Sequence, residues 1–266
     1  MKKHIIKLGG SIITDTSSKA SFNKKNTLRL AKELYPFYKG CILIHGTGQV
    51  GKPPAIKYGY VDNGILTKNE HLIALNIKNS LRQLNQHVVQ TFLSASIPAI
   101  PFDILHFYDE SKNHLNYIGL KDILLKMLKN GLVPVFYGDL LPLPDGSFKV
   151  FSSDLITLLL TKTLEPENVI FLSDVNGVYL EYPKPNNEAS SNIIPVLNPK
   201  NVRLLKKSEN DKKDVSGGMR KKAELALEIS CYCKRCFIGN GLTDNILSDF
   251  FKEKSVVGTF VRSKNI

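Results

Sequence analysis

The sequence predicts an α/β protein built as a three-layer sandwich, in which helices cover both faces of a mainly parallel central sheet. Short strand-like runs alternate with longer amphipathic runs along the chain, an order that is typical of parallel sheets with crossover helices. The strand-like runs end near Gly, Asp or Asn, which favour turns. A chain of 266 residues, 42% of them hydrophobic, can bury such a core.

Six short runs are rich in β-branched or aromatic residues and have the length of buried strands. They are 4–9 (HIIKLG), 40–46 (GCILIHG), 97–102 (IPAIPF), 132–138 (LVPVFYG), 168–174 (NVIFLSD) and 235–240 (RCFIGN).

Helices are predicted between these strands, where apolar residues recur at three- and four-residue spacing and so form one buried face. The helical runs are 26–38, 69–95, 121–131 and 219–232. Two polar segments, 181–192 and 206–214, are predicted to be loops or lids.

The formal net charge of +12 raises the question of a nucleic-acid partner. The lysines are spread along the sequence in small groups, such as Lys24 with Lys25, and no basic stripe with interleaved aromatic residues is present. We therefore expect no nucleic-acid partner but a lysine-rich surface that attracts small anionic substrates.

No apolar run approaches the roughly 18 residues that a membrane span requires. The N-terminal stretch MKKHIIKLGG lacks the apolar core of a signal peptide and is interpreted as the first strand. We expect a cytoplasmic protein without a membrane partner.

Three of the four cysteines, Cys231, Cys233 and Cys236, lie close together in CYCKRCF. A metal site is one interpretation, but no second group of Cys and His lies at ligand spacing. The segment has the pattern of a helix end that runs into a strand, so reduced structural thiols are expected and no metal site.

Glycine-rich turns follow several predicted strands, and ligands of open α/β sheets bind at the carboxyl ends of the strands. The turns are KLGGS (7–11), the predicted loop HGTGQVGKPPA (45–55), YGD (137–139), SDVNGVY (173–179) and, before a helix, DVSGGM (214–219). A tight turn explains any one of them, whereas five at one sheet edge indicate an anion site. None has the spacing of a P-loop or a dinucleotide fingerprint.

The segments KLGGSIIT, IHGTGQVGKPPA, VPVFYGD, FLSDVNGVY and DVSGGMRKK resemble, in order and spacing, the amino acid kinase superfamily. The chain is most similar to its isopentenyl phosphate kinase branch, which serves isoprenoid biosynthesis, and to the related fosfomycin kinases. The resemblance extends from the first strand to GTF at 258–260. It implies the amino acid kinase fold as a single domain over 1–266, with an acceptor-binding half (about 1–160) and a nucleotide-binding half (about 161–266), and a homodimer.

The resemblance also assigns the catalytic groups and the nucleotide site. Lys7 and Lys222 approach the transferred phosphoryl from opposite sides, and Asp174 lies between them and orients them. ATP brings Mg²⁺, whose ligands are mainly phosphate and water, so no protein metal cage is expected. The nucleotide contacts are Gly9, Gly10, Ser11, Ser173, Gly177, Tyr179, Gly217 and Gly218.

The acceptor loop of this branch is similar to HGxGSFGH, whose glycine N–H groups and final histidine hold the accepting phosphate. Lys52 occupies the histidine position and is a catalytic candidate, since a cationic side chain stabilises an anionic acceptor. His45 is interpreted as a structural histidine. The implied acceptor contacts are Gly46, Thr47, Gly48, Gly51, Lys52, Ser153 and Asp154.

Two further features concern the acceptor. The branch places a lysine where this chain has Asp15 or Thr16, and Lys19 is the candidate replacement. The helix predicted at 69–95 lines the acceptor's tail in the branch, and its residues predicted to do so are Leu72, Leu75, Asn76 and Asn79.

Three functions stay open at this point. The first is an ATP-dependent kinase of a small phosphate or phosphonate, with isopentenyl phosphate as the nearest example. The second keeps the ATP site but phosphorylates a hydroxyl or carboxylate of a polar metabolite or antibiotic. The third is a nucleotide-sensing protein without turnover, which the presence of Lys7, Asp174 and Lys222 disfavours.

Overall fold

The structure is a computed structural model of the chain. It describes residues 1–15, 21–57, 65–66, 71–109, 114–115, 117–143, 146–180, 193–205 and 218–263. The predicted loops or lids at 181–192 and 206–214 lie outside these ranges, and so do Thr16, Lys19 and Gly217.

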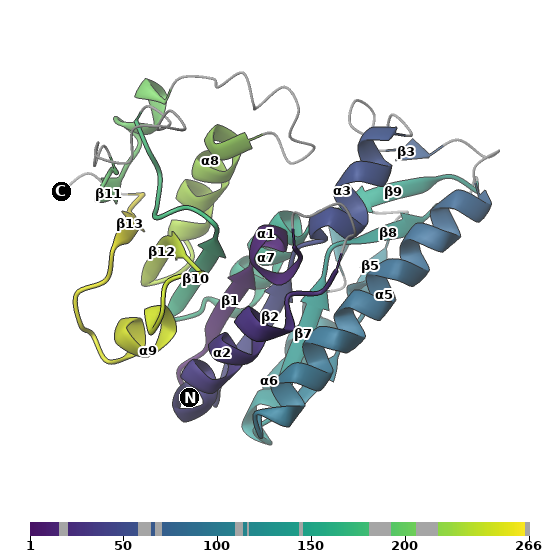
Figure 1. Ribbon diagram of the computed structural model, residues 1–266, viewed down its shortest axis with the longest axis horizontal. Helices are drawn as coiled ribbons and strands as arrows, with labels where there is room; N and C mark the ends of the chain where they lie inside the picture. Colours follow the sequence, from purple (N-terminus) through teal and green to yellow (C-terminus); the bar gives the residue numbers. More distant parts are fainter. Residues whose placement is uncertain are drawn as a thin grey trace.

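The central sheet has eight strands in the order β11-β13-β12-β10-β1-β2-β7-β4 (Figure 1). Neighbouring strands run parallel except for the antiparallel pair β12 and β13, so the prediction of a mainly parallel sheet is confirmed. The strands are β1 (His4–Leu8), β2 (Cys41–His45), β4 (Ala99–Pro101), β7 (Val133–Tyr137), β10 (Asn168–Ser173), β11 (Val196–Leu197), β12 (Arg235–Asn240) and β13 (Gly258–Val261).

Helices cover both faces of this sheet and complete the predicted three layers (Figure 1). One face packs against α2 (Lys24–Leu34), α5 (His71–Ser94) and α9 (Ile246–Phe251). The other face packs against α6 (Tyr117–Lys129), α7 (Ser153–Leu164) and α8 (Gly218–Ser230). Side chains of β1 alternate between these two cores, since Ile5 belongs to the second and Ile6 to the first.

A smaller layer lies beside α5. There, β3 (Ile65–Leu66), β9 (Phe148–Phe151) and β8 (Asp139–Pro142) form a three-stranded antiparallel sheet. A third apolar cluster joins it to α5 through Ala74, Ile77, Leu81, Tyr137, Leu140 and Phe148. The remaining described elements are α1 (Gly10–Ile13), α3 (Gly48–Lys57), β5 (Tyr108–Asp109), β6 (His114–Leu115) and the 3-10 turns η1 (Tyr35–Phe37), η3 (Ile104–Phe107) and η5 (Val202–Leu204).

The predicted glycine loop at 45–55 is wrong beyond Thr47, because the chain enters α3 at Gly48. Glycine and proline are unfavourable inside helices, so the sequence did not indicate this helix. It contains Gly48, Gly51, Pro53 and Pro54. In a helix interior, proline lacks a backbone donor and its ring clashes with the carbonyl of residue i−4, so local sequence disfavours the helix that the structure contains here. The acceptor segment is therefore a two-residue turn followed by a helix.

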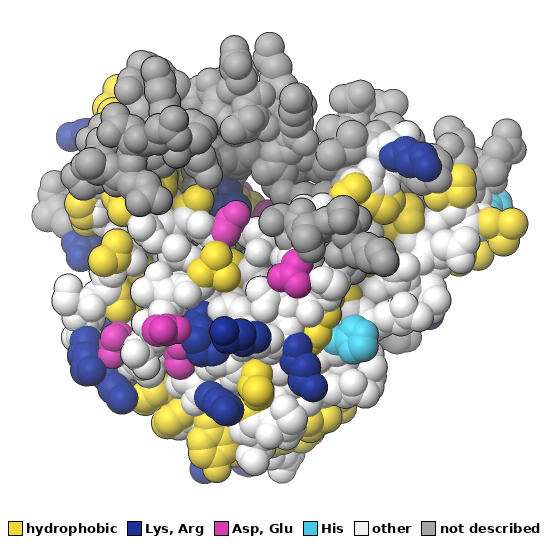
Figure 2. Space-filling view, in the orientation of Figure 1, with side chains coloured by type: hydrophobic (Ala, Val, Ile, Leu, Met, Phe, Trp, Pro, Cys, Tyr) yellow, Lys and Arg dark blue, Asp and Glu magenta, His cyan; other side chains and the backbone are white. Residues whose placement is uncertain are grey.

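Among the residues that Figure 2 colours by type, basic side chains are interspersed with acidic and apolar ones and form no continuous stripe. None of the helices in the described part of the chain has the length and hydropathy needed to cross a bilayer.

Candidate active site at the carboxyl edge of the sheet

Four glycines continue the parallel ladders past the carboxyl ends of the strands. Each follows a strand and donates its N–H to the end of a neighbouring strand, so the turns are held side by side at one edge. The bonds run from Gly9 to Leu172 O (2.7 Å), Gly46 to Leu8 O (2.8 Å), Gly138 to His45 O (3.2 Å) and Gly241 to Ser173 O (2.7 Å).

Two of the predicted site glycines are required by close backbone contact. A Cβ on Gly10 would lie 2.1 Å from the backbone N of Gly48, and a Cβ on Gly48 would lie 2.1 Å from Thr14 Oγ1. Gly48 also has φ +50°, a region that other residues rarely adopt. The segment after β1 and the start of α3 thus pack backbone against backbone, which gives both glycines a structural role.

Thr14 connects the segment after β1 to the start of α3 through hydrogen bonds. Its buried hydroxyl donates to Gly10 O at 2.8 Å and accepts from the N–H of Gln49 at 3.1 Å. Sequence reasoning did not select Thr14, although it is the last residue of KLGGSIIT. Its contacts fix the position of the Gly10–Ser11 turn relative to the first turn of α3.

Thr47 marks the junction between the ends of β2 and β7 and the start of α7. A Cβ on Gly138 would lie 3.2 Å from the Thr47 methyl and 3.1 Å from the backbone N of Ser153. A Cβ on Gly51 would lie 2.5 Å from Thr47 Cβ. The structure therefore brings the predicted acceptor residues Thr47, Gly51 and Ser153 to one place.

Lys7 forms an ion pair with Asp154, with Nζ and Oδ1 2.8 Å apart. The alternation along β1 directs Lys7 to the face covered by α7, and Asp154 lies in the first turn of that helix. Ser152 caps the helix by accepting the N–H of Leu155 at 3.1 Å. The side chains of Lys7 and Asp154 are only 7% and 17% exposed, so a buried cation is held beside a carboxylate at the sheet edge.

Asp174 contacts a different group. Its Oδ1 accepts a hydrogen bond from Ser11 Oγ at 2.9 Å, which ties the turn after β10 to the turn after β1. The hydroxyl of Ser173 is buried and has no hydrogen-bond partner among the described residues. The carboxylate that the structure places at Lys7 is therefore Asp154, which sequence reasoning had given to the acceptor.

The other catalytic candidates lie on helices that begin at this edge. Lys222 is half-buried in α8, one turn after Gly218, and α8 starts at the carboxyl edge because it leads into the parallel strand β12. Lys52 lies on α3, one turn after Gly48; its side chain lies outside the described part. Gly9 directly follows β1 as predicted, whereas Gly10 and Ser11 begin the single-turn helix α1.

The turn with Gly177 and Tyr179 is anchored to the edge of the sheet. A Cβ on Gly177 would lie 2.7 Å from Thr259 Oγ1, which accepts the N–H of Val178 at 2.8 Å. Tyr179 pairs with Ile193 in an isolated bridge. The structure therefore explains Gly177 by packing against β13.

Comparison with known proteins decides how this edge is to be understood. A sequence model of the amino acid kinase family matches residues 2–240. The chain belongs to the amino acid kinase family.

The relatives of this amino acid kinase include isopentenyl phosphate kinase of Methanocaldococcus jannaschii, 30% identical over 89% of the chain and 90% of the relative. Acetylglutamate kinase of Kosmotoga olearia is 23% identical over 100% of the chain and 93% of the relative. An X-ray structure of isopentenyl phosphate kinase is similar with a TM-score of 0.77 and 25% identity, covering 97% of this chain and 99% of the other. The chain is a phosphotransferase, as the resemblance implied.

His45 is a structural residue of this kinase. Its ring is buried, stacks on Tyr137 with centroids 5.7 Å apart, and lies with Nδ1 2.9 Å from Gly46 O and Nε2 3.1 Å from Asn85 Nδ2. One neutral tautomer satisfies both contacts, with Nδ1–H donating and Nε2 accepting. Burial lowers the pKa of His45 to about 4, although the bond to Gly46 opposes this. The prediction of a structural histidine is confirmed.

We expect the kinase to lose stability as the pH falls from about 6.5 to 4. The unfolded chain protonates His45 near its ordinary pKa of 6.5, whereas the folded chain holds it neutral down to about 4. The unfolded state therefore binds more protons in this window, at a cost of about 1–3 kcal/mol. Urea unfolding at pH 7 and pH 5 should show a smaller loss for His45→Gln than for the wild type. The exposed His87→Gln variant is the control; equal losses in wild type and His45→Gln would contradict the prediction.

The carboxylate of the YGD motif is also structural. Asp139 forms a buried ion pair with Lys78 of α5, whose ammonium also donates to Leu140 O at 3.0 Å. Burial raises the pKa of Asp139, and Lys78 opposes that shift. This pair fastens α5 to the start of β8.

The predicted tail-lining face of α5 is wrong. Leu72 and Leu75 are 78% and 51% exposed, and Asn76 and Asn79 are exposed as well. The buried face is turned to the β8–β9 hairpin and carries Ala74, Ile77, Lys78 and Leu81. Apolar residues surround this part of the helix, so periodicity alone did not fix which face is buried.

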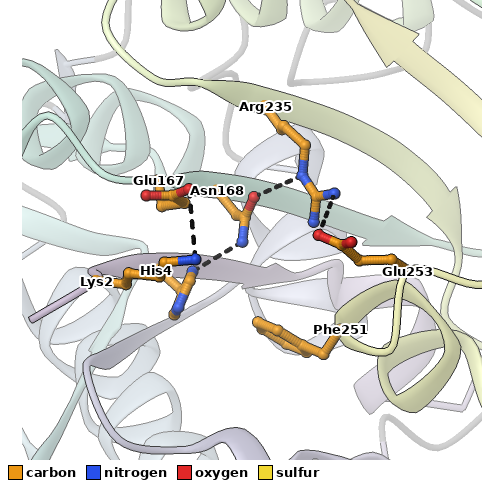
Figure 3. Close-up of a pocket in the computed structure, with 7 residues that line it drawn as sticks. All are labelled: Lys2, His4, Glu167, Asn168, Arg235, Phe251 and Glu253. Atoms are coloured by element: carbon orange, nitrogen blue, oxygen red, sulfur yellow. Dashed lines mark hydrogen bonds and ion pairs between the residues drawn. The ribbon is translucent and has the colours of Figure 1, made fainter.

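A pocket lies at the opposite, amino edge of the sheet (Figure 3). Its polar groups bond one another: Asn168 Nδ2 donates to His4 Nδ1 at 2.9 Å, and Arg235 Nε donates to Asn168 Oδ1 at 2.9 Å. Arg235 also forms an ion pair with Glu253, with Nη1 and Oε1 3.6 Å apart. The polar groups of this pocket are paired with one another, and they lie at the edge of the sheet opposite the glycine turns. The carboxyl edge is therefore the candidate active site.

The four cysteines are free thiols, as expected. The segment from Cys231 to Cys236 connects α8 to β12, which confirms the predicted change from helix to strand.

Proposed function

We propose that the chain is an ATP-dependent kinase that transfers the γ-phosphoryl group to a small phosphate or phosphonate, with isopentenyl phosphate as the nearest substrate. The observation that carries the proposal is the Lys7–Asp154 pair, held at the carboxyl edge beside the Ser11–Asp174 contact. The likeness to isopentenyl phosphate kinase over 89% of the chain supports the choice of substrate.

Phosphoryl transfer requires mainly that the two reactants are held in line and that charge on the moving group is stabilised. Lys7 supplies a cation in a water-poor position, where an electrostatic contact is strong. Lys222 supplies a second cation from α8. The N–H groups of Gly9 and Gly10 are proposed to serve the phosphates of the nucleotide, together with Gly218 at the start of α8.

The contacts of Asp154 and Asp174 favour roles for these residues that differ from the roles that the resemblance implied. We propose that Asp154 orients Lys7, since the two are 2.8 Å apart. Asp174 then fixes the phosphate-binding turn through Ser11, its partner at 2.9 Å. Asp154 belongs in this scheme to the reaction centre and not to the acceptor's tail.

The acceptor's anion is assigned to the start of α3. A helix N-terminus carries a partial positive charge, and α3 begins at Gly48, directly after the turn that follows β2. The N–H of Gln49 is already bonded to Thr14 Oγ1, so the proposal rests on this partial charge and on Lys52. Lys52 lies one turn further along the same helix. The acceptor half of the domain is therefore proposed to be about 1–160 and the nucleotide half about 161–266.

An apolar tail on the acceptor is supported by the likeness to isopentenyl phosphate kinase. Val50 of α3 packs against the third apolar cluster and so links the start of α3 to α5, β8 and β9. The members of this cluster are buried, so they form the packing behind the proposed anion site and not an open surface. The likeness therefore favours the first function over the second.

Magnesium is proposed to enter with ATP. Asp154 and Asp174 are engaged by Lys7 and Ser11, and the described residues contain no group of three or more His, Cys, Asp or Glu side chains placed to hold a metal. This donor set suits an ion held mainly by phosphate oxygens and water. When bound, Mg²⁺ would neutralise charge between the phosphates.

A kinase of a carboxylate or hydroxyl is the second candidate, and the likeness to acetylglutamate kinase supports it. The purified protein should be mixed with ATP and Mg²⁺ and tested against monophosphates, phosphonates and N-acylated amino acids, with ADP release as the readout. We expect turnover with isopentenyl phosphate. Turnover with amino acids alone would favour the second candidate, and ADP binding without turnover on any acceptor would favour the sensor.

We also propose a homodimer that pairs through α5. Leu72 and Leu75 on this helix are exposed in the single chain, and a self-complementary interface would bury them. Sedimentation at micromolar concentration should show a species near 60 kDa, twice the 29.7 kDa of the chain. Leu72→Glu should shift it to monomer, and a wild type that sediments as a monomer would contradict the proposal.

A further inference from the structure

A polar stripe on α2 is formed by Asn26, Arg29 and Glu33, which share one face of the helix at spacings of three and four residues. Asn26 is 9% exposed, and the side chains of Arg29 and Glu33 are 23% and 8% exposed. Charged residues are seldom so enclosed unless they are paired. The stripe is therefore a built feature and not a solvated helix face.

The stripe bonds to the backbone of segments at the carboxyl edge. Asn26 Nδ2 donates to Ile12 O at 2.9 Å, directly after Ser11 in α1. Arg29 donates to Gly241 O and, at 2.8 Å, to Thr243 O, both in the loop after β12. Within the stripe, Arg29 donates to Asn26 Oδ1 at 2.7 Å and to Glu33.

Glu33 extends the same contact to the helix that follows the loop. Its two carboxylate oxygens accept the N–H groups of Asn245 at 2.9 Å and Leu247 at 3.0 Å, at the start of α9. A carboxylate at a helix N-terminus satisfies N–H groups that have no partner within the helix. Both ends of the 241–245 loop are thus held by one helix.

The 241–245 loop packs against Ile12 and Ser173, next to the proposed phosphate-binding residues. Gly241 donates its N–H to Ser173 O at 2.7 Å, and a Cβ on Gly241 would lie 2.4 Å from Ile12 Cδ1. Ser173 precedes Asp174, which accepts from Ser11. Hydrogen bonds therefore connect Ser11 to Asp174, Ser173 to Gly241, Gly241 to Arg29, and Arg29 through Asn26 to Ile12. Since Ser173 adjoins Asp174 and Ile12 adjoins Ser11, these contacts form a closed ring.

We infer that the α2 stripe holds the Ser11–Asp174 turn in its nucleotide-binding position, with Arg29 as the central positioning residue. This inference rests on the proposed function, in which that turn binds the phosphates of ATP. Arginine suits the role because its planar guanidinium offers five donors, whereas lysine offers three from one atom. The stripe acts through its bonds to the backbone carbonyls of Ile12, Gly241 and Thr243.

The first test is ADP affinity in the presence of Mg²⁺, measured by calorimetry at 25 °C. Arg29→Met should weaken ADP binding five- to tenfold, and Arg29→Lys should fall between Arg29→Met and the wild type. Leu34→Ala is the matched control, because Leu34 lies on the same helix but faces the apolar core. It should lower the melting temperature and leave ADP affinity within twofold of the wild type. Unchanged ADP affinity in a folded Arg29→Met variant would overturn the inference.

Amide hydrogen exchange of the ligand-free chain is the second test, and it does not depend on nucleotide binding. Arg29→Met should speed exchange at least fivefold in peptides covering residues 9–14 and 241–247. Peptides from β7 on the far side of the sheet should be unaffected. A wild type that binds no ADP would contradict the proposed function, whereas unchanged exchange in both segments would overturn the positioning role alone.

Discussion

Lys7→Met should lower kcat by a factor on the order of 10²–10³, or about 3–4 kcal/mol of transition-state stabilisation. The ammonium of Lys7 lies 2.8 Å from Asp154 and its side chain is only 7% exposed, so water cannot replace the lost charge easily. Methionine keeps most of the volume and removes the charge. Steady-state kinetics with saturating ATP and the acceptor found by the screen measure the effect.

The exposed Lys126→Met variant on α6 is the control for the loss of one positive charge, and it should have wild-type kcat. Circular dichroism and thermal melting would show that Lys7→Met is folded. A folded Lys7→Met enzyme with near wild-type kcat would remove Lys7 from the reaction centre. Lys222→Met should lower kcat by a factor on the order of 10² if both lysines contact the transferred group.

The two aspartates can be separated by the same assay. Asp154→Asn should lower kcat strongly, because an amide cannot hold the ammonium of Lys7 as a carboxylate does. Asp174→Asn still accepts from Ser11 through its amide oxygen, so it should affect the KM of ATP more than kcat. The reverse pattern would return the orienting role to Asp174.

Lys52→Ala should lower kcat/KM for the acceptor by roughly 2–4 kcal/mol, the range for truncating one partner of a desolvated charge pair. The KM of ATP should change less than twofold. The physical reason is that the acceptor keeps the helix N-terminus of α3 but loses the cation that neutralises its charge. Initial rates over a range of acceptor concentrations measure both constants.

Lys52→His restores the residue of the resembling branch and tests the sign of the acceptor's charge. Its activity should rise as the pH falls below about 6.5, where imidazolium is populated. The comparison is the ratio of variant to wild-type rates, which cancels the acid loss of stability shared by both. If Lys52→Ala and Lys52→His both leave acceptor kinetics unchanged, the acceptor does not use this cation and the second candidate function gains support.

The strands were predictable because buried parallel strands appear as short, continuous apolar runs. All six predicted strands form; β12 has its predicted range, and the ends of the other five differ from the predicted ranges by one or two residues. The four predicted helices also form. Local sequence is sufficient for such elements, since each has a clear period or a clear apolar run that ends at turn residues.

Several described elements were not predicted from the sequence, and three of them show why. Helix α3 was not predicted because it contains Gly48 and Pro53, which are unfavourable in helices. Helix α7 was not predicted because it is a run of Leu and Thr without a clear helical period. Its start was marked by Ser152, a capping residue that accepts the N–H of Leu155. The third is β13, whose pairing with β12 depends on residues that are distant in the sequence.

The sequence by itself determined six strands of the sheet, the glycines directly after β1, β2 and β7 and the kinase family, because each depends on short motifs of residues close together in the chain. Tertiary structure alone decided which carboxylate meets Lys7 and which face of α5 is buried. Asp154 reaches Lys7 only because α7 begins beside the end of β1 and turns its first residues toward it. The order of strands and the rotation of each helix set such pairings, and both are fixed when the two apolar cores close on the sheet.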